Sequence, residues 1–156
     1  MSLKNYYIHV IFNQKQLIMK KLFTPVSLNT DLATLVLRLI FGGMFTYHGW
    51  GKLAMYDEML KMFGDPIGLG TELSLVLTIF GEFICGILIV LGLFTRLAVI
   101  PVFITMLVAY FVAHGNDDFM VKMLPFVYML LCFVVFILGS GRYSLDAAIF
   151  DKNRNN

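Results

Sequence analysis

Four long apolar runs follow one another along this chain, and they constrain its fold more than any other feature. The runs extend from about Leu32 to Met55, Leu73 to Phe94, Leu97 to His114 and Val121 to Leu138. A helix needs about 20 apolar residues to cross the hydrocarbon core of a bilayer. Only helices and closed barrels satisfy their own backbone polar groups there. We therefore predict an all-α polytopic membrane protein, an antiparallel bundle of four transmembrane helices.

Composition supports a membrane location and excludes one class of partner. Of the 156 residues, 59% are hydrophobic and 14% are charged, whereas a typical soluble domain has about 25% charged residues. The net charge of +2 is small, and the basic residues do not gather into a helix that could read bases. The expected partner is the lipid bilayer, not nucleic acid. A redox partner protein and a homo-oligomer both stay open.

Loop charge predicts the orientation of the bundle. The face that holds both termini carries most of the basic residues: Lys4, Lys15, Lys20, Lys21, Arg96, Arg142, Lys152 and Arg154. The opposite face has Lys52, Lys61 and Lys122. Because Lys and Arg are enriched in cytoplasmic loops, we predict that both termini are cytoplasmic.

The domain organisation follows from these runs. We expect a cytoplasmic N-terminal tail over 1–27, a four-helix transmembrane domain over 28–141 and a cytoplasmic C-terminal tail over 142–156. Residues 1–18 are polar around a short apolar run and are followed by Met19, so they are either an upstream extension of the reading frame or an amphipathic surface tail.

Polar residues at the ends of the runs predict where the helices begin. Asn29 or Thr30 is a candidate N-cap for the first helix, and Thr71 for the second, because such side chains accept a hydrogen bond from the first turn. We expect a wet loop over Tyr56 to Gly70 between them. The C-terminal tail is expected to hold a short surface helix capped by Ser144.

Arg38 and Glu82 are the charged residues that lie deep within the predicted spans. At about 1.5 Å per residue, we place them at comparable depths on the first and second helices. An isolated charge at that depth is costly, so we predict a buried ion pair between them. The pair would either fix the packing of the helices or serve a polar site.

Helical spacing places Arg38 and Glu82 each within a stripe of residues along one face of its helix. The first-helix stripe is Arg38, Gly42, Phe45, Gly49 and Lys52, with His48 on its flank. The second-helix stripe is Ser74, Thr78, Glu82, Cys85 and Gly86. Small residues allow membrane helices to approach closely, so each stripe is a packing face, a site, or both.

His48 and His114 each close a helix that runs outward, and each is followed by glycine. They are expected at the same outer level, with Tyr47, Trp50 and Tyr110 nearby. One interpretation is an interfacial aromatic belt, and the other is a redox-linked or proton-linked pocket. The spacing does not favour a metal site. Cys85 and Cys132 are expected to pack as small hydrophobic residues.

The sequence resembles the DoxX family. The segment Arg38-Leu39, Gly42, His48-Gly49 and Lys52-Leu53 is similar to the first-helix signature of that family. The other landmarks are Glu82 with Gly86, the segment Leu91 to Arg96, Met106, His114, and the segment Gly139 to Asp146. One departure is Cys85-Gly86, where family members often have two glycines.

The resemblance implies a four-helix protein of the bacterial inner membrane that is associated with redox work. One branch of the family is similar to a subunit of a thiosulfate:quinone oxidoreductase, and another belongs to a membrane complex that handles oxidative and thiol stress. On that basis the leading hypothesis is a redox-associated subunit that contacts quinone. The alternatives are a small proton-coupled carrier and a non-catalytic scaffold or assembly factor.

In the leading hypothesis, the polar centre consists of Arg38, Glu82, His48 and His114. Glu82 would pass a proton, Arg38 would hold its charge, and the two histidines would bind a quinone carbonyl. Phe45, Trp50 and Tyr110 would supply apolar walls around the ring.

Overall fold

The computed structural model describes residues 7, 11–13, 15–16 and 29–151. The chain divides into two units, Met1–Thr30 and Asp31–Asn156. The described residues of the first unit are helical except Asn29. Most of residues 1–28, including Met19, and residues 152–156 lie outside the described part, as do the expectations that concern them.

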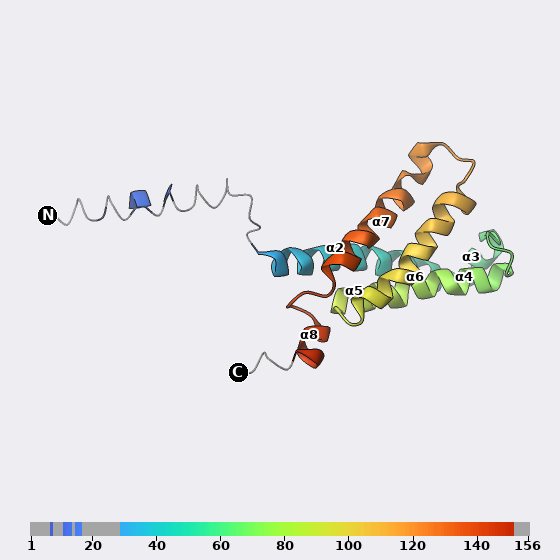
Figure 1. Cartoon of the computed structure of the whole chain (residues 1–156). Helices are drawn as coiled ribbons and strands as arrows, with labels where there is room; N and C mark the ends of the chain where they lie inside the picture. Colours follow the sequence, from blue (N-terminus) through green and yellow to red (C-terminus); the bar gives the residue numbers. More distant parts are fainter. Residues whose placement is uncertain (1–6, 8–10, 14, 17–28, 152–156) are drawn as a thin grey trace. The chain divides into compact units, whose positions relative to one another are not determined.

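Four helical segments in the described part are long and apolar enough to cross a membrane. They are α2 (Thr30–Ala54), the run Thr71–Leu91, the run Thr95–Ala113, and α7 (Phe119–Leu138) (Figure 1). The second run consists of α4 (Thr71–Ile79), the π-helical turn η1 (Phe80–Ile84) and α5 (Cys85–Leu91). The third consists of α6 (Thr95–Val108) and a second π-helical turn, η2 (Ala109–Ala113). The prediction of an all-α protein with four spans is confirmed.

Two short helices lie outside the spans. The first, α3 (Tyr56–Met62), occupies the first half of the segment 56–70 that was expected to be a loop. The second, α8 (Leu145–Phe150), begins directly after Ser144, whose hydroxyl accepts a hydrogen bond from the backbone N–H of Ala147 at 3.1 Å. The predicted cap of the C-terminal surface helix is therefore confirmed.

The second span begins differently from the prediction. Thr71 is the first residue of α4, and the capping position belongs to Gly70, whose φ of +93° suits glycine. The carboxylate of Asp65 accepts hydrogen bonds from the N–H groups of Leu69 and Gly70 and from the hydroxyl of Ser74. Asp65 thus holds the loop against the start of α4, but none of these bonds comes from a backbone N–H of the first helical turn.

The two ends of the bundle are distinct. We call the end of the bundle that carries Asp31, Gly92 and Arg142 the near end. The opposite end, which carries Lys52 and the loop 63–70, is the far end. The backbone N–H of Arg142 donates to the carboxylate of Asp31 at 3.1 Å, which joins the last span to the first at the near end. This agrees with an even number of antiparallel spans, whereas the side of the membrane on which the near end lies stays a prediction.

Close packing of α2 against η1 and α5 depends on glycine. A Cβ added at Gly42 would lie 2.8 Å from the carbonyl oxygen of Gly86, and one added at Gly86 would lie 2.8 Å from the backbone nitrogen of Thr46. A Cβ at Gly49 would collide with the backbone of Phe83. Small residues allow this approach. These contacts also fix the register, because Gly49 is level with Phe83 and Gly42 is level with the turn from Gly86 to Val90.

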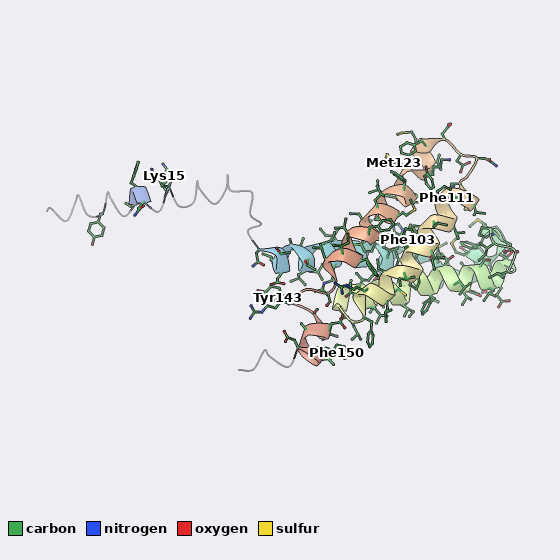
Figure 2. The ribbon with its side chains drawn as sticks, viewed as in Figure 1. Lys15, Phe103, Phe111, Met123, Tyr143 and Phe150 are labelled. Atoms are coloured by element: carbon green, nitrogen blue, oxygen red, sulfur yellow. The ribbon has the colours of Figure 1, made fainter. Side chains whose placement is uncertain are left out.

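A shared apolar core fills the near half of the bundle. It includes Phe41 of α2, Ile89 of α5, Val102 of α6 and Val135 of α7. Cys85 and Cys132 are free, and both are buried in this core, which confirms that they pack as small hydrophobic residues. Large apolar side chains on the other faces, such as Phe111 and Met123, point outward (Figure 2). These faces suit contact with lipid.

The hairpin of α6 and α7 is inclined to α4 (Figure 1). Its two helices lie side by side, and α6 also packs on η1 and α5. Where α6 crosses the second span, Gly81 leaves room for the hydroxyl of Thr105, which would lie 2.7 Å from an added Cβ.

Candidate functional site

The buried carboxylate of the second span is paired with a lysine. The Nζ of Lys52 donates to Oε2 of Glu82 at 2.5 Å. The side chain of Glu82 is 7% exposed and that of Lys52 is 22% exposed. Glu82 lies on the π-helical turn η1, and such turns occur frequently at functional sites. We call Lys52 and Glu82 the carboxylate pair.

Arg38 occupies a different centre, at the near end. It is 1% exposed, and its guanidinium donates to the carbonyl oxygens of Ile89 and Val90 at 3.4 Å and to that of Tyr143. The carboxylate of Asp146 attracts the guanidinium and also accepts a hydrogen bond from the N–H of Phe94 at 2.9 Å. Arg38 thus satisfies carbonyls at the end of α5 and holds the C-terminal segment against the bundle.

The predicted ion pair between Arg38 and Glu82 is wrong. The register set by the glycines places Arg38 eleven residues below Gly49, or about 16 Å at 1.5 Å per residue. Glu82 is the direct neighbour of Phe83, which is level with Gly49. The two charges therefore lie at different depths.

The direction of helical side chains explains which cation meets Glu82. The Cα–Cβ bonds of a helix tilt toward its N-terminus. Because α2 runs from the near end to the far end, Lys52 extends inward while Arg38 extends toward the near end. Glu82 lies on a span that runs the other way, so its side chain tilts toward the far end and Lys52. This rule, together with the register set by Gly42 and Gly49, accounts for the observed pairing.

The two histidines do not form one pocket with these charges in the described contacts. His48 is exposed on α2, with its ring 5.8 Å from that of Tyr47. The Nδ1 of His114 lies 2.8 Å from a carboxylate oxygen of Asp117, and both side chains are more than 40% exposed. Tyr110 packs on Phe126 of α7, with ring centroids 5.5 Å apart.

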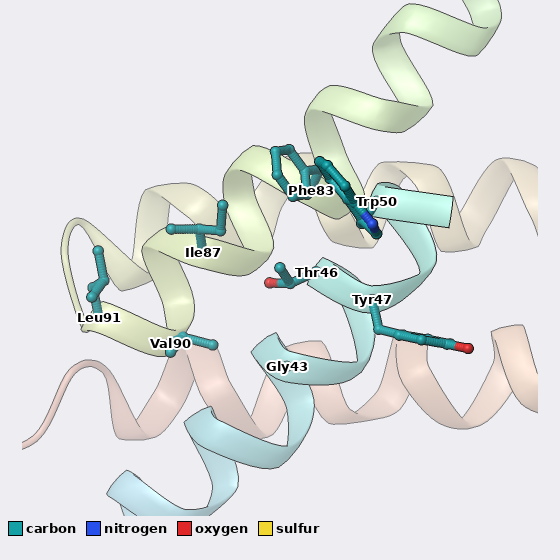
Figure 3. Close-up of a pocket in the computed structure, with 8 residues that line it drawn as sticks. All are labelled: Gly43, Thr46, Tyr47, Trp50, Phe83, Ile87, Val90 and Leu91. Carbon is teal, nitrogen blue, oxygen red and sulfur yellow. The ribbon is translucent and has the colours of Figure 1, made fainter. Parts of the chain in front are cut away.

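The two remaining predicted wall residues lie in different places. Phe45 is buried in the core, 2% exposed, with its ring 5.0 Å from that of Tyr128. Trp50 lines a groove between α2 and the second span, where its ring faces that of Phe83 at 5.8 Å (Figure 3). This α2–α5 groove has a volume of about 530 Å³. Its lining residues are Gly43, Thr46, Tyr47, Trp50, Phe83, Ile87, Val90 and Leu91.

A second cavity, the α4–α6 pocket, lies between α4 and α6 under the loop 63–70. Its volume is about 360 Å³. Three hydroxyls, those of Ser74, Thr78 and Thr105, stand among apolar residues. The apolar lining consists of Pro66, Ile67, Leu77, Phe80, Pro101, Ile104 and Val108. Ser74 and Thr78 belong to the stripe seen in the sequence, whereas Thr105 was not singled out because only tertiary packing brings it there.

Metal ligands do not gather in the described part of the chain. No group of three or more His, Cys, Asp or Glu side chains there is close enough to hold a metal ion.

Comparisons with known proteins agree with this architecture. The DoxX family model matches residues 33–115. An uncharacterized protein of Haemophilus influenzae (strain ATCC 51907 / DSM 11121 / KW20 / Rd) is 32% identical over 123 residues, which cover 74% of this chain and 90% of the relative. A Bacillus subtilis (strain 168) protein with the name "Putative oxidoreductase CatD" is 30% identical over 127 residues, which cover 80% and 92%. No solved structure matches the chain.

Proposed function

Because the chain belongs to the DoxX family of multi-pass membrane proteins, we propose that it is a redox-associated subunit that contacts a lipid-soluble quinone. Reduction of a quinone to a quinol takes two electrons and two protons. In this proposal a partner redox protein supplies the electrons, and Glu82 passes protons. The bacterial inner membrane is its proposed location.

The carboxylate pair is the observation that carries the proposal. An ionisable group inside a span is costly and usually marks a pathway for protons or substrate. Glu82 is nearly inaccessible, whereas its partner Lys52 is three times as exposed. Through its hydrogen bond with the more exposed Lys52, Glu82 is connected toward the far end of the bundle. The name given to the Bacillus subtilis relative adds support for a redox role.

Arg38 stands outside the proposed proton path. Its partners are backbone carbonyls and Asp146 at the near end, so its role in the proposal is to hold the bundle together. His48, His114 and Tyr110 stay predictions for contact with a quinone or a partner protein at the far end.

The experiment measures quinone that copurifies with the full-length protein. Lipids are extracted from detergent-purified protein, and quinone is quantified per protein. The variants are Glu82→Gln and Lys52→Gln, with Glu72→Gln as the control, because Glu72 is exposed in the first turn of α4. We expect quinone in the wild type and the control, and a loss of about tenfold in both pair variants while circular dichroism stays helical.

Two results would contradict the proposal. The first is absence of quinone from the wild type. The second is full retention of quinone in both pair variants. Variants of the pair that fail to fold would instead support the scaffold alternative for these residues.

A further inference from the structure

The three hydroxyls of the α4–α6 pocket share one property, which is that their protons are already used. The hydroxyl of Ser74 donates to the carboxylate of Asp65 at 3.1 Å, that of Thr78 to the carbonyl of Ser74 at 2.9 Å, and that of Thr105 to the carbonyl of Pro101 at 3.0 Å. A hydroxyl has one proton to donate and two lone pairs to accept with. These three hydroxyls can therefore only accept hydrogen bonds from a ligand.

The rest of the lining is apolar and suits an apolar ligand. Phe80 and Leu77 come from the second span, Ile104 from α6, and Pro66 from the loop above. The volume of about 360 Å³ lies within the range that small organic ligands occupy. The apolar residues would contact the faces of a ring, and the lone pairs would meet its edge.

Two sides of the pocket are held in place, the roof formed by the loop 63–70 and the floor formed by Thr105 of α6. Asp65 ties the loop that carries Pro66 to Ser74, through hydrogen bonds to Leu69, Gly70 and the Ser74 hydroxyl. At the floor, Thr105 lies against Gly81, the residue before Glu82.

We propose that the α4–α6 pocket binds the hydroxylated, reduced ring of a quinol in preference to the oxidised ring of a quinone. Quinol hydroxyls donate hydrogen bonds, which the lone pairs of Thr78 and Thr105 accept. Quinone carbonyls only accept, so they find no donor among these three side chains. The inference rests on the proposed quinone contact and adds the place and the redox form of the bound ring.

The experiment is equilibrium binding of a soluble short-chain benzoquinol, and of the matching benzoquinone, to the full-length protein in detergent without oxygen. The variants Thr78→Val and Thr105→Val remove a hydroxyl and keep the shape. Thr46→Val is the matched control, because the Thr46 hydroxyl also donates to a carbonyl one turn back, that of Gly42, but lines the α2–α5 groove.

We expect the wild type to bind the quinol about tenfold more tightly than the quinone. Each pocket variant should weaken quinol binding about three- to tenfold, the range for one lost hydrogen bond, and leave quinone binding within about twofold. The control should bind both forms as the wild type does. A filling variant, Val108→Phe, should weaken both forms, and unchanged thermal unfolding would show that each variant is folded.

Several results would overturn the inference: equal affinity for the two forms, equal behaviour of the pocket variants and the control, or no binding. A lipid acyl chain as the only occupant would make binding insensitive to both hydroxyls. Copurifying quinone together with insensitivity to both valine variants would refute this pocket and leave the proposed function standing. Hydroxyl-dependent binding of the quinol without any copurifying quinone would refute the proposed function and leave this pocket standing.

Discussion

Adjacent glycines on α2 allow a sharp test of the helix packing. A Cβ at Gly42 would lie 2.8 Å from the carbonyl oxygen of Gly86 and 2.9 Å from the backbone nitrogen of Val90. Backbone atoms cannot move aside without separating the helices, and such overpacking costs about 1–3 kcal/mol. A Cβ at Gly43 meets no heavy atom within 4 Å. Both substitutions to Ala gain up to about 1 kcal/mol of helix propensity, so this gain cancels in the comparison.

We therefore expect Gly42→Ala to be about 1–3 kcal/mol less stable than Gly43→Ala. The assay is unfolding of the detergent-solubilised protein by increasing mole fraction of sodium dodecyl sulfate, followed by circular dichroism. Gly51→Ala is a second control, because a Cβ at Gly51 also meets nothing within 4 Å. Equal stability of the Gly42 and Gly43 variants would refute the register of α2 against α5.

Three further outcomes are expected at the near end and in the loop 63–70. Arg38→Met should destabilise the protein by about 3 kcal/mol or more, because it leaves buried carbonyls without their donor and Asp146 without the nearby positive charge. A lowered thermal midpoint in detergent would measure this. Ser144→Ala should destabilise α8 locally by about 0.5–2 kcal/mol, seen as faster hydrogen exchange over residues 145–150. The backbone N–H of Gly70, with other donors, lowers the pKa of Asp65 below its usual 3.8. The amides of the loop should therefore stay protected from hydrogen exchange above pH 3.8 and lose that protection as the pH falls further. Hydrogen exchange over residues 66–70 at two pH values would measure this.

The local features of the fold were predictable from the sequence because they depend on local chemistry. Length and apolarity define the four spans, and the position of Ser144 before Leu145 defines the cap of α8. The burial of Cys85 and Cys132 follows from the apolar runs around them. The start of α4 was predicted incorrectly because Gly70, and not Thr71, holds the capping position. Gly70 is fixed there by a hydrogen bond from its N–H to Asp65, five residues earlier in the folded loop.

The pairing of charges was predicted incorrectly because depth was counted from the ends of the apolar runs, which do not fix the register of α2 against the second span. Arg38 and Lys52 are long side chains, and both extend toward the start of α2. Counting from the run ends placed Lys52 at the opposite face of the bundle and left Arg38 as the nearest cation to Glu82. The register needed for the correct pairing is set by Gly42, Gly49 and their contacts across the helix interface.

The α4–α6 pocket illustrates what a single sequence leaves out. The stripe on the second span contained Ser74 and Thr78, but nothing in the sequence indicates that Thr105 of α6 joins them. Thr105 reaches the pocket because Gly81 leaves space where the helices cross.

The central claim is that Glu82 is coupled to Lys52 and not to Arg38, and two double-mutant cycles test it most directly. One cycle combines Lys52→Met with Glu82→Gln, and the other combines Arg38→Gln with Glu82→Gln, each measured as free energy of unfolding in detergent. We predict a coupling energy of about 1 kcal/mol or more between Lys52 and Glu82, and additivity within about 0.5 kcal/mol between Arg38 and Glu82. Strong coupling in the Arg38 cycle, with additivity in the Lys52 cycle, would contradict the structure's assignment of the pair.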